Sequence, residues 1–223
     1  MIEFIFLILF ICVSVAQIIG VAKENQKLNY STKPLLMPLL ALYYAFGSLA
    51  LNSFNWLIVV ALLFGCGGDI FLMLEGKESY FLIGMVSFLL GHVFYIIAFL
   101  MSMGTNYALG AISLPILILP VIIILYATFP KFKDGLGDMK IPVFVYMGAI
   151  VFMHVTAILR VTFYGLLCTR FFSVYLGSIL FILSDSILAI GEFSERKISH
   201  IRVYTMSTYI LGQFLIALGM IRI

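Results

Sequence analysis

The feature that most constrains this chain is a series of apolar runs, each about as long as a membrane is thick. A membrane-crossing helix needs about 20 mostly apolar residues, and polar clusters divide the chain into runs of that length. We therefore expect an all-α fold, a polytopic bundle of eight transmembrane helices that forms a single integral membrane domain over residues 1–223. The predicted spans are 3–21, 34–51, 56–74, 80–102, 108–129, 142–161, 171–191 and 203–221.

The composition supports a membrane domain with no separate soluble part. Hydrophobic residues make up 64% of the chain and charged residues 10%, whereas soluble domains are about half apolar and about a quarter charged. The mean hydropathy is +1.19. The first run carries Glu3 and has no basic residue ahead of it, so we interpret it as a spanning helix rather than a signal peptide. The cysteines form no metal-binding pattern and are expected to be small core residues.

The count of eight spans depends on two breaks, at 52–55 and 165–170, that are less polar than the others, so a count of seven stays open. The basic residues favour eight. Three of them, Arg160, Arg170 and Arg222, fall on one side of the predicted membrane. By the positive-inside rule this side is non-cytoplasmic and carries both termini. The ten on the cytoplasmic side are Lys23, Lys27, Lys33, Lys77, Lys131, Lys133, Lys140, Arg196, Lys197 and Arg202.

The net charge of +3 is explained by this topology. The basic residues are spread over short loops and give no indication of nucleic-acid binding. Pro34 and Pro142 are expected to open helices, where proline is well tolerated. Pro115 and Pro120 lie inside the fifth predicted span and are expected to kink it, which neighbouring helices in a membrane can accommodate.

Similar motifs in the two halves suggest a parallel four-plus-four repeat. Spans two and six both begin just after a lysine followed by a proline. The ends of spans three and seven, and the middles of spans four and eight, share short motifs as well. These are Gly68-Asp69-Ile70-Phe71-Leu72 with Ser184-Asp185-Ser186-Ile187-Leu188, and Leu90-Gly91-His92 with Leu211-Gly212-Gln213.

Asp69 and Asp185 are the least expected residues in these apolar helices. An aspartate near the centre of a spanning helix costs about 2.5–3.5 kcal/mol on insertion scales, while a leucine returns only about 0.5 kcal/mol. The two therefore require partners or a hydrated cavity. One interpretation is that each bonds locally, with Ser184, Ser186 or Ser178, and holds helices together.

The topology favours a second interpretation, in which Asp69 and Asp185 act as a pair. Both lie near the cytoplasmic ends of spans that run in the same direction, so they are expected at similar depth. Two carboxylates that face each other in a low dielectric do not both ionise easily, which gives a proton donor beside a base. General acid–base hydrolysis requires that arrangement.

Other polar residues in the spans are candidate binding residues, each with a structural alternative. His92 lies mid-span in span four, where Ser87, Gly91 and Tyr95 form a small and polar stripe. The alternative for His92 is a packing role with a bond to a backbone carbonyl. Tyr209 and Gln213 share a face of span eight that either lines a polar cavity or bonds to another helix. Lys33 either binds a phosphate or extends to the interface as an anchor.

These residues also carry a resemblance to a known family. The chain from about 30 to 215 resembles the YhhN family of membrane proteins, which includes lysoplasmalogenases. The motifs in order are Lys33-Pro34-Leu35, Gly68-Asp69-Ile70-Phe71-Leu72-Met73-Leu74, Phe88-Leu89-Leu90-Gly91-His92-Val93-Phe94-Tyr95, Gly177-Ser178-Ile179-Leu180-Phe181-Ile182-Leu183-Ser184-Asp185, and Tyr209 with Gln213.

The resemblance implies an eight-helix membrane hydrolase that cleaves the vinyl ether of lysoplasmalogens with choline or ethanolamine head groups. The products are a fatty aldehyde and a glycerophospho-base. The candidate catalytic residues of the family correspond to Asp69 and Asp185. Acid and base suffice for this reaction, much as in glycosidases, so no metal or other cofactor is expected, and the partners are the lysophospholipid substrate and membrane lipid. The predicted substrate-binding residues are Lys33, His92, Tyr95, Ser184, Tyr209 and Gln213.

Two other classes of protein stay open at this point. Buried acids and a four-plus-four repeat are also typical of proton-coupled transporters, although a site in the cytoplasmic half differs from a midplane transport site. A non-catalytic lipid-binding scaffold, in which the acids are structural, is the third class. The expected location is the plasma (inner) membrane in a bacterial host and the endoplasmic reticulum in a eukaryotic one.

Overall fold

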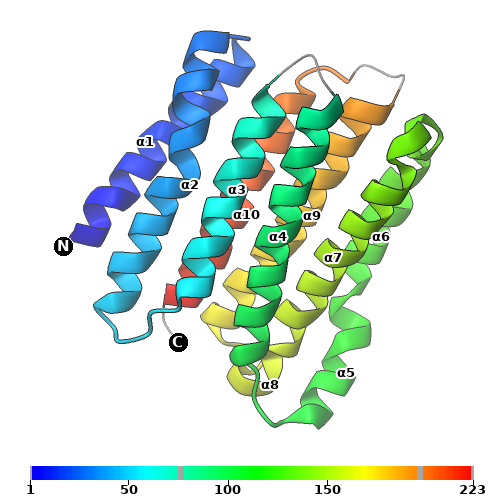
Figure 1. The fold of residues 1–223 in the computed structure, drawn as a ribbon. Coiled ribbons are helices and arrows are strands. Elements are labelled where there is room, and N and C mark those ends of the chain that lie inside the picture. The colour runs from blue at the N-terminus through cyan, green and yellow to red at the C-terminus, as the bar shows by residue number, and fades with distance from the viewer. Residues whose placement is uncertain (1, 75–77, 195–197, 222–223) are drawn as a thin grey trace.

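The fold is a bundle of long helices that run alternately up and down (Figure 1). The computed structural model describes residues 2–74, 78–194 and 198–221, and all regular structure in these ranges is helical. The α-helices are α1 (Ile2–Ala22), α2 (Gln26–Leu49), α3 (Trp56–Met73), α4 (Glu78–Met101), α5 (Tyr107–Leu117), α6 (Leu119–Thr128), α7 (Lys140–Leu159), α8 (Val161–Tyr164), α9 (Thr169–Phe193) and α10 (Ile201–Ile221).

The connections divide between the two ends of the bundle. At one end α1 joins α2, α3 joins α4, α6 joins α7 and α9 joins α10; at the other lie both termini (Figure 1). The α6–α7 connection consists of three short 3₁₀ turns, Phe129–Lys131, Lys133–Gly135 and Gly137–Met139. We call the first of these ends the cavity end, because it carries the cavity described below.

Seven segments are long and apolar enough to cross a membrane, judged by length and composition in the described part of the chain. The helix outside this set is α2. A count of seven was expected only if one of the two weak breaks was absent, but both breaks are present. α2 ends at Leu49 and α3 begins at Trp56. Gly165, with a φ of +74°, separates α8 from α9. Four of the basic residues used to orient the spans, Lys77, Arg196, Lys197 and Arg222, lie outside the described residues.

Two expectations about the second span are wrong. The helix begins at Gln26 instead of 34, because the Asn25 side chain accepts a hydrogen bond from the Leu28 amide and caps a polar first turn. Pro34 therefore lies inside α2 and does not open it. In the fifth predicted span the helix is divided at Ile118, between α5 and α6. Pro120 lies in the first turn of the second part, which begins at Leu119.

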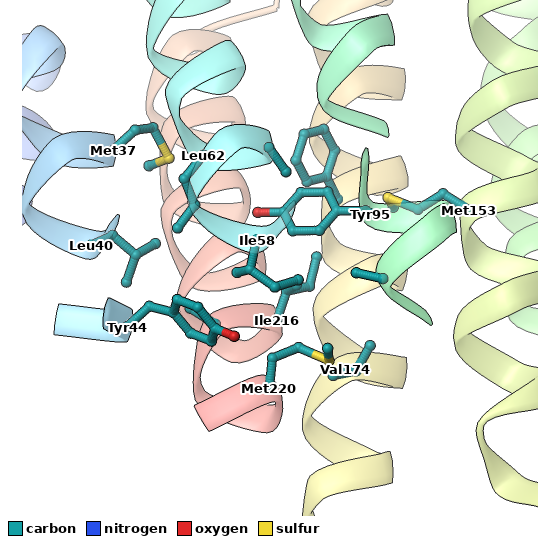
Figure 2. Packing of buried hydrophobic residues seen from close by; sticks show 14 of the residues in the cluster. Met37, Leu40, Tyr44, Ile58, Leu62, Tyr95, Met153, Val174, Ile216 and Met220 are labelled. Atoms are coloured by element: carbon teal, nitrogen blue, oxygen red, sulfur yellow. The ribbon is translucent and has the colours of Figure 1, made fainter. Parts of the chain in front are cut away.

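A continuous apolar core joins α2, α3, α4, α7, α9 and α10 at mid-bundle (Figure 2). Met37, Leu40 and Tyr44 of α2 face Ile58 and Leu62 of α3, and all five are buried. Burial of this kind contributes about 1.5–3 kcal/mol for each large side chain in water. Within a membrane the same packing acts through close contact rather than through exclusion of water.

Glycines permit two close crossings with corresponding positions. In the α3–α4 pair, a Cβ at Gly91 would lie 3.1 Å from the Ala61 carbonyl oxygen. In the α9–α10 pair, a Cβ at Gly212 would lie 3.0 Å from the Gly177 carbonyl oxygen. These two crossings hold the helices that carry Asp69 and Asp185 against their neighbours.

Candidate active site

The cavity end contains one large cavity, of about 550 Å³, that is lined by both Asp69 and Asp185. We call it the main cavity. It lies among the helices α1, α2, α3, α4, α9 and α10, and Met139 reaches it from the 3₁₀ segment. Its polar and charged lining residues are Gln26, Asn29, Tyr30, Lys33, Asp69, Ser184, Asp185, Glu192, Arg202, Thr205 and Tyr209.

Asp69 has a cation and a phenol as partners. It lies about one turn before the end of α3, and only 2% of its surface is exposed. The Lys33 ammonium lies 3.7 Å from Asp69 Oδ1, and the Tyr209 hydroxyl donates to Oδ2 at 2.8 Å. The Lys33 side chain is 13% exposed. The cation from α2 and the donor from α10 together favour the ionised form of this carboxylate.

Helix α3 brings Asp69 to the cavity through a tight contact with α4. A Cβ at Gly68 would lie 2.4 Å from the ring of Phe88, so only glycine lets the ring approach this closely. Phe88 itself lines the main cavity. The glycines before Asp69 thus act as a close helix crossing, the simpler of the roles that such a run of glycines can have.

Asp185 has a different environment. It lies about two turns before the end of α9 and is partly exposed to the cavity. The Tyr146 hydroxyl of α7 donates a hydrogen bond to Asp185 Oδ2. Within the described ranges Asp185 forms no ion pair. Both carboxylates line the main cavity, which therefore holds a pair of acids with unequal partners.

A smaller cavity, of about 60 Å³, adjoins the main one at Asp185. We call it the apolar recess. Its walls come from α3, α4, α6, α7 and α9, and Phe132 of the α6–α7 connection covers it. The lining residues are Leu72, Phe81, Met85, Phe88, Leu125, Phe132, Val143, Tyr146, Met147, Ile150, Ile182, Asp185, Ser186, Leu188, Ala189 and Phe193.

The mouth of the main cavity is polar. Asn29 is held in place by Gln17 of α1, whose side-chain amide donates to its oxygen. The Tyr30 hydroxyl donates to the Met73 carbonyl at 2.8 Å and joins the start of α2 to the end of α3. Arg202 and Glu192 are exposed and line the same space from α10 and α9.

The predicted binding residues divide into two groups. Lys33, Ser184 and Tyr209 line the main cavity together with both aspartates. Lys33 is paired with Asp69, and Ser184 donates to the Thr205 carbonyl of α10 at 3.0 Å.

The other predicted residues, His92, Tyr95 and Gln213, are buried deeper in the bundle and line neither cavity. The Tyr95 hydroxyl donates to the Gln213 side-chain oxygen at 2.6 Å, which joins α4 to α10. His92 Nδ1 lies 2.5 Å from the Phe88 carbonyl oxygen, and its ring packs edge-on against Tyr146. These three therefore support the site from the layer beneath it.

Tyr146 and Arg202 are among the residues at the site that were not identified from the sequence. Tyr146 stands in an apolar stretch of the sixth span with no polar neighbour. The sequence signal that could have identified it is its spacing. Tyr146 stands 39 residues before its partner Asp185, and Lys33 stands 36 residues before its partner Asp69. Arg202 was counted as a loop residue, but it belongs to the first turn of α10.

The acids of the cavity do not form a recognisable metal centre. In the described part of the chain, no group of three or more His, Cys, Asp or Glu side chains is placed to hold a metal ion. The polar groups suited to a ligand are instead the two carboxylates, the ammonium of Lys33 and the phenol of Tyr209.

The fold and the cavity define a polytopic α-helical membrane protein with two acids in an internal cavity near one end of the bundle. The sequence matches the YhhN family over residues 28–220, and the chain belongs to that family. This confirms the resemblance seen in the sequence. No curated protein and no solved structure matches the chain.

Proposed function

We propose that this protein is a membrane hydrolase that cleaves the vinyl ether of lysoplasmalogens, releasing a fatty aldehyde and a glycerophospho-base. The observation that carries the proposal is the shared position of Asp69 and Asp185 in one cavity of about 550 Å³. Two carboxylates from different helices rarely meet in an apolar bundle without a role in chemistry or transport. Membership of the YhhN family, which includes lysoplasmalogenases, supports hydrolysis.

The walls of the cavity suit a lysophospholipid. One part of the lining is charged and polar and the other is apolar, as a ligand with a zwitterionic head and a hydrocarbon chain requires. The mouth carries Arg202, a partner for the phosphate, and Glu192, a partner for the ammonium of choline or ethanolamine. Lys33 is engaged with Asp69, so the phosphate role expected for it passes to Arg202.

The reaction needs one acid and one anion. A protonated carboxyl transfers its proton to the β-carbon of the vinyl ether, and the double bond becomes an oxocarbenium ion. The second carboxylate stabilises this cation, and the proton released by the water that adds to it returns to the first carboxyl group. The resulting hemiacetal breaks its bond to the glycerol oxygen, which gives the aldehyde and the alcohol.

The proposal includes the position of the protein in the membrane. We infer that α2 is an eighth membrane pass, since it runs the length of the bundle and packs against α1, α3 and α10. The positive-inside rule then makes the cavity end cytoplasmic, so the head group enters from that side. A reporter fused to the C-terminus is expected to remain outside the cytoplasm, and a cytoplasmic signal would contradict this topology.

We also infer that the eight passes are two copies of a four-helix unit. The crossing of Ala61 with Gly91 and that of Gly177 with Gly212 fall at corresponding positions in the two halves. The contact of α4 with α7 likewise corresponds to that of α10 with α2. In each case the fourth helix of one unit packs against the second helix of the other, as expected for parallel repeats. The same correspondence pairs Asp69 of the first unit with Asp185 of the second.

The experiment that tests the function is an assay of the purified protein on three lysophospholipids that differ only at the first carbon. We expect aldehyde from the 1-alkenyl lipid and no product from the 1-alkyl ether, which has no double bond to protonate. Fatty acid from the 1-acyl lipid would indicate an esterase instead. Proton flux in liposomes with no aldehyde from any alkenyl lipid would favour a transporter.

A further inference from the structure

We propose that the substrate lies in the cavity in one orientation, with the first methylene groups of its chain in the apolar recess beside Asp185 and its head group on the side of Lys33. It follows that Asp185 is the proton donor and that Asp69 is the anion that stabilises the oxocarbenium ion. This inference rests on the proposed function and deepens it.

The first observation is the unequal pairing of the two carboxylates. Asp69 has an ammonium at 3.7 Å and a phenol donor at 2.8 Å, and both stabilise its negative charge. Asp185 has one donor, Tyr146, and no ion pair in the part of the chain that the structure describes. A carboxyl group without a cation in an apolar setting holds its proton more readily. The proton of the pair therefore resides on Asp185.

The second observation is the position of the apolar recess. Asp185 lines both the recess and the main cavity, whereas Asp69 lines the main cavity alone. The recess has room for a short run of methylene groups, and its walls are chiefly Leu, Phe, Met and Ile side chains. The two cations that line the main cavity in the described ranges, Lys33 and Arg202, line no part of the recess.

The chemistry of the substrate connects the two observations. In a vinyl ether the carbon that accepts the proton is attached to the hydrocarbon chain, and the carbon that becomes cationic is attached to the ether oxygen. A chain in the recess places the first carbon beside Asp185. The second carbon and the ether oxygen then lie toward Asp69 and the polar mouth. The partners of the two carboxylates and the position of the apolar recess thus independently assign the same roles, Asp185 as proton donor and Asp69 as stabilising anion.

The proposed reaction moves one proton out of Asp185 and back again. Asp185 gives its proton to the chain-side carbon and becomes a carboxylate, while the oxocarbenium ion forms beside the Asp69 anion. Water adds to the cationic carbon, and its released proton returns to Asp185. Collapse of the hemiacetal moves the hydroxyl proton to the glycerol oxygen as the carbon–oxygen bond breaks. Lys33 keeps Asp69 anionic throughout and is a positioning residue.

Binding of a cationic analogue tests the roles. A lysophospholipid with a secondary ammonium in place of the ether oxygen mimics the positive charge of the oxocarbenium ion, and the matching 1-alkyl ether is its neutral control. Wild type is expected to prefer the ammonium compound, and Asp69→Asn to lose that preference by at least about tenfold, as for close charge pairs. Asp185→Asn is expected to retain it. Loss in Asp185→Asn with retention in Asp69→Asn, or no preference in wild type, would overturn the assignment.

Chain-length dependence tests the orientation. Val143 is buried in the wall of the recess, and Val145 is 57% exposed on the outer side of the same helix. Val143→Phe is expected to lower kcat/KM at least about tenfold for a hexadecenyl lysophospholipid, as expected for a few methylenes lost from a pocket. A propenyl substrate, which ends before the recess, should change less than about twofold. Val145→Phe is the control and should leave both substrates unchanged.

The milder substitution Ala189→Val reports on the same recess if Val143→Phe fails to fold, because Ala189 lies one turn from Asp185. An equal loss for long and short chains would overturn the orientation. Absence of aldehyde from wild type with any alkenyl lipid would contradict the proposed function itself. The two failures are therefore distinguishable.

Discussion

Asp69 and Asp185 line one cavity from two different helices, α3 and α9, yet their surroundings differ. Asp69 is 2% exposed and is held by Lys33 and Tyr209. Asp185 opens on two cavities and is held by Tyr146 alone in the described ranges. One acid of the cavity is thus paired with a cation and the other is not, which is the basis for the different roles that we propose for them. Acid–base catalysis requires this inequality.

The largest expected effect comes from removing either carboxyl group. Asp69→Asn and Asp185→Asn are each expected to lower kcat on alkenyl lysophospholipid about 10²–10⁴-fold, the usual contribution of an acid or base. Asp134→Asn is the control, since Asp134 is exposed in the α6–α7 connection at the same end of the bundle. Full activity in either site variant would remove that residue from the mechanism.

The next effect concerns the cation that distinguishes the two acids. Lys33→Met removes the only ion pair of Asp69 in the described ranges, and we expect kcat to fall roughly 10²-fold, as for other electrostatic partners of a reacting charge. Lys33→Arg keeps the charge and should recover part of the rate. If Lys33→Met raised KM with no change in kcat, the lysine would bind the phosphate, as first predicted from the sequence.

The two tyrosines give a smaller and unequal effect. Tyr146→Phe leaves Asp185 with no partner in the described structure, while Tyr209→Phe leaves Asp69 with Lys33. Asp185 becomes charged as it gives up its proton, and a hydrogen bond to a charged group contributes about 1.5–3 kcal/mol. The first change is therefore expected to cost about 10–100-fold in kcat/KM and the second less. A larger loss of kcat/KM in Tyr209→Phe than in Tyr146→Phe would contradict the difference that we assign to the two acids.

The smallest effect is expected at the mouth. Arg202 is exposed, and exposed charge pairs contribute about 1 kcal/mol or less. Arg202→Ala should therefore raise KM about threefold to fivefold and leave kcat unchanged. Steady-state measurement of KM and kcat on substrates with choline and ethanolamine head groups checks this prediction. A fall in kcat of the same size would place Arg202 closer to the reacting atoms than the structure does.

The sequence predicted the elements of the bundle well because membrane spans are determined by length and polarity. The start of α2 was placed too late for a physical reason: Gln26, Asn29 and Lys33 are polar because they line a cavity, and in sequence such residues are typical of a loop. The two aspartates were recognised by the cost of burying them. Tyr146 was missed because a tyrosine in an apolar helix carries no such cost and its partner lies on another helix.

The roles that we propose for the acids could not be predicted from the sequence for a similar reason. They depend on which side chain reaches which carboxylate, and Lys33 reaches Asp69 across the α2–α3 contact rather than along one helix. Depth predicted that Asp69 and Asp185 lie at a similar level, and both line one cavity. Their unequal partners arise from packing. His92, Tyr95 and Gln213 were grouped with the site by their polarity, but their partners lie in the layer beneath it.

The most direct test of the central claim is the fate of the transferred proton. Purified protein is incubated with 1-alkenyl lysophospholipid in D₂O, the aldehyde is reduced at once to the alcohol, and its label is measured by mass spectrometry. Protonation of the vinyl ether by a carboxyl group predicts one deuterium at the second carbon, formed at a rate that depends on Asp69 and Asp185. Absence of aldehyde, or aldehyde without deuterium at that carbon, would contradict the account.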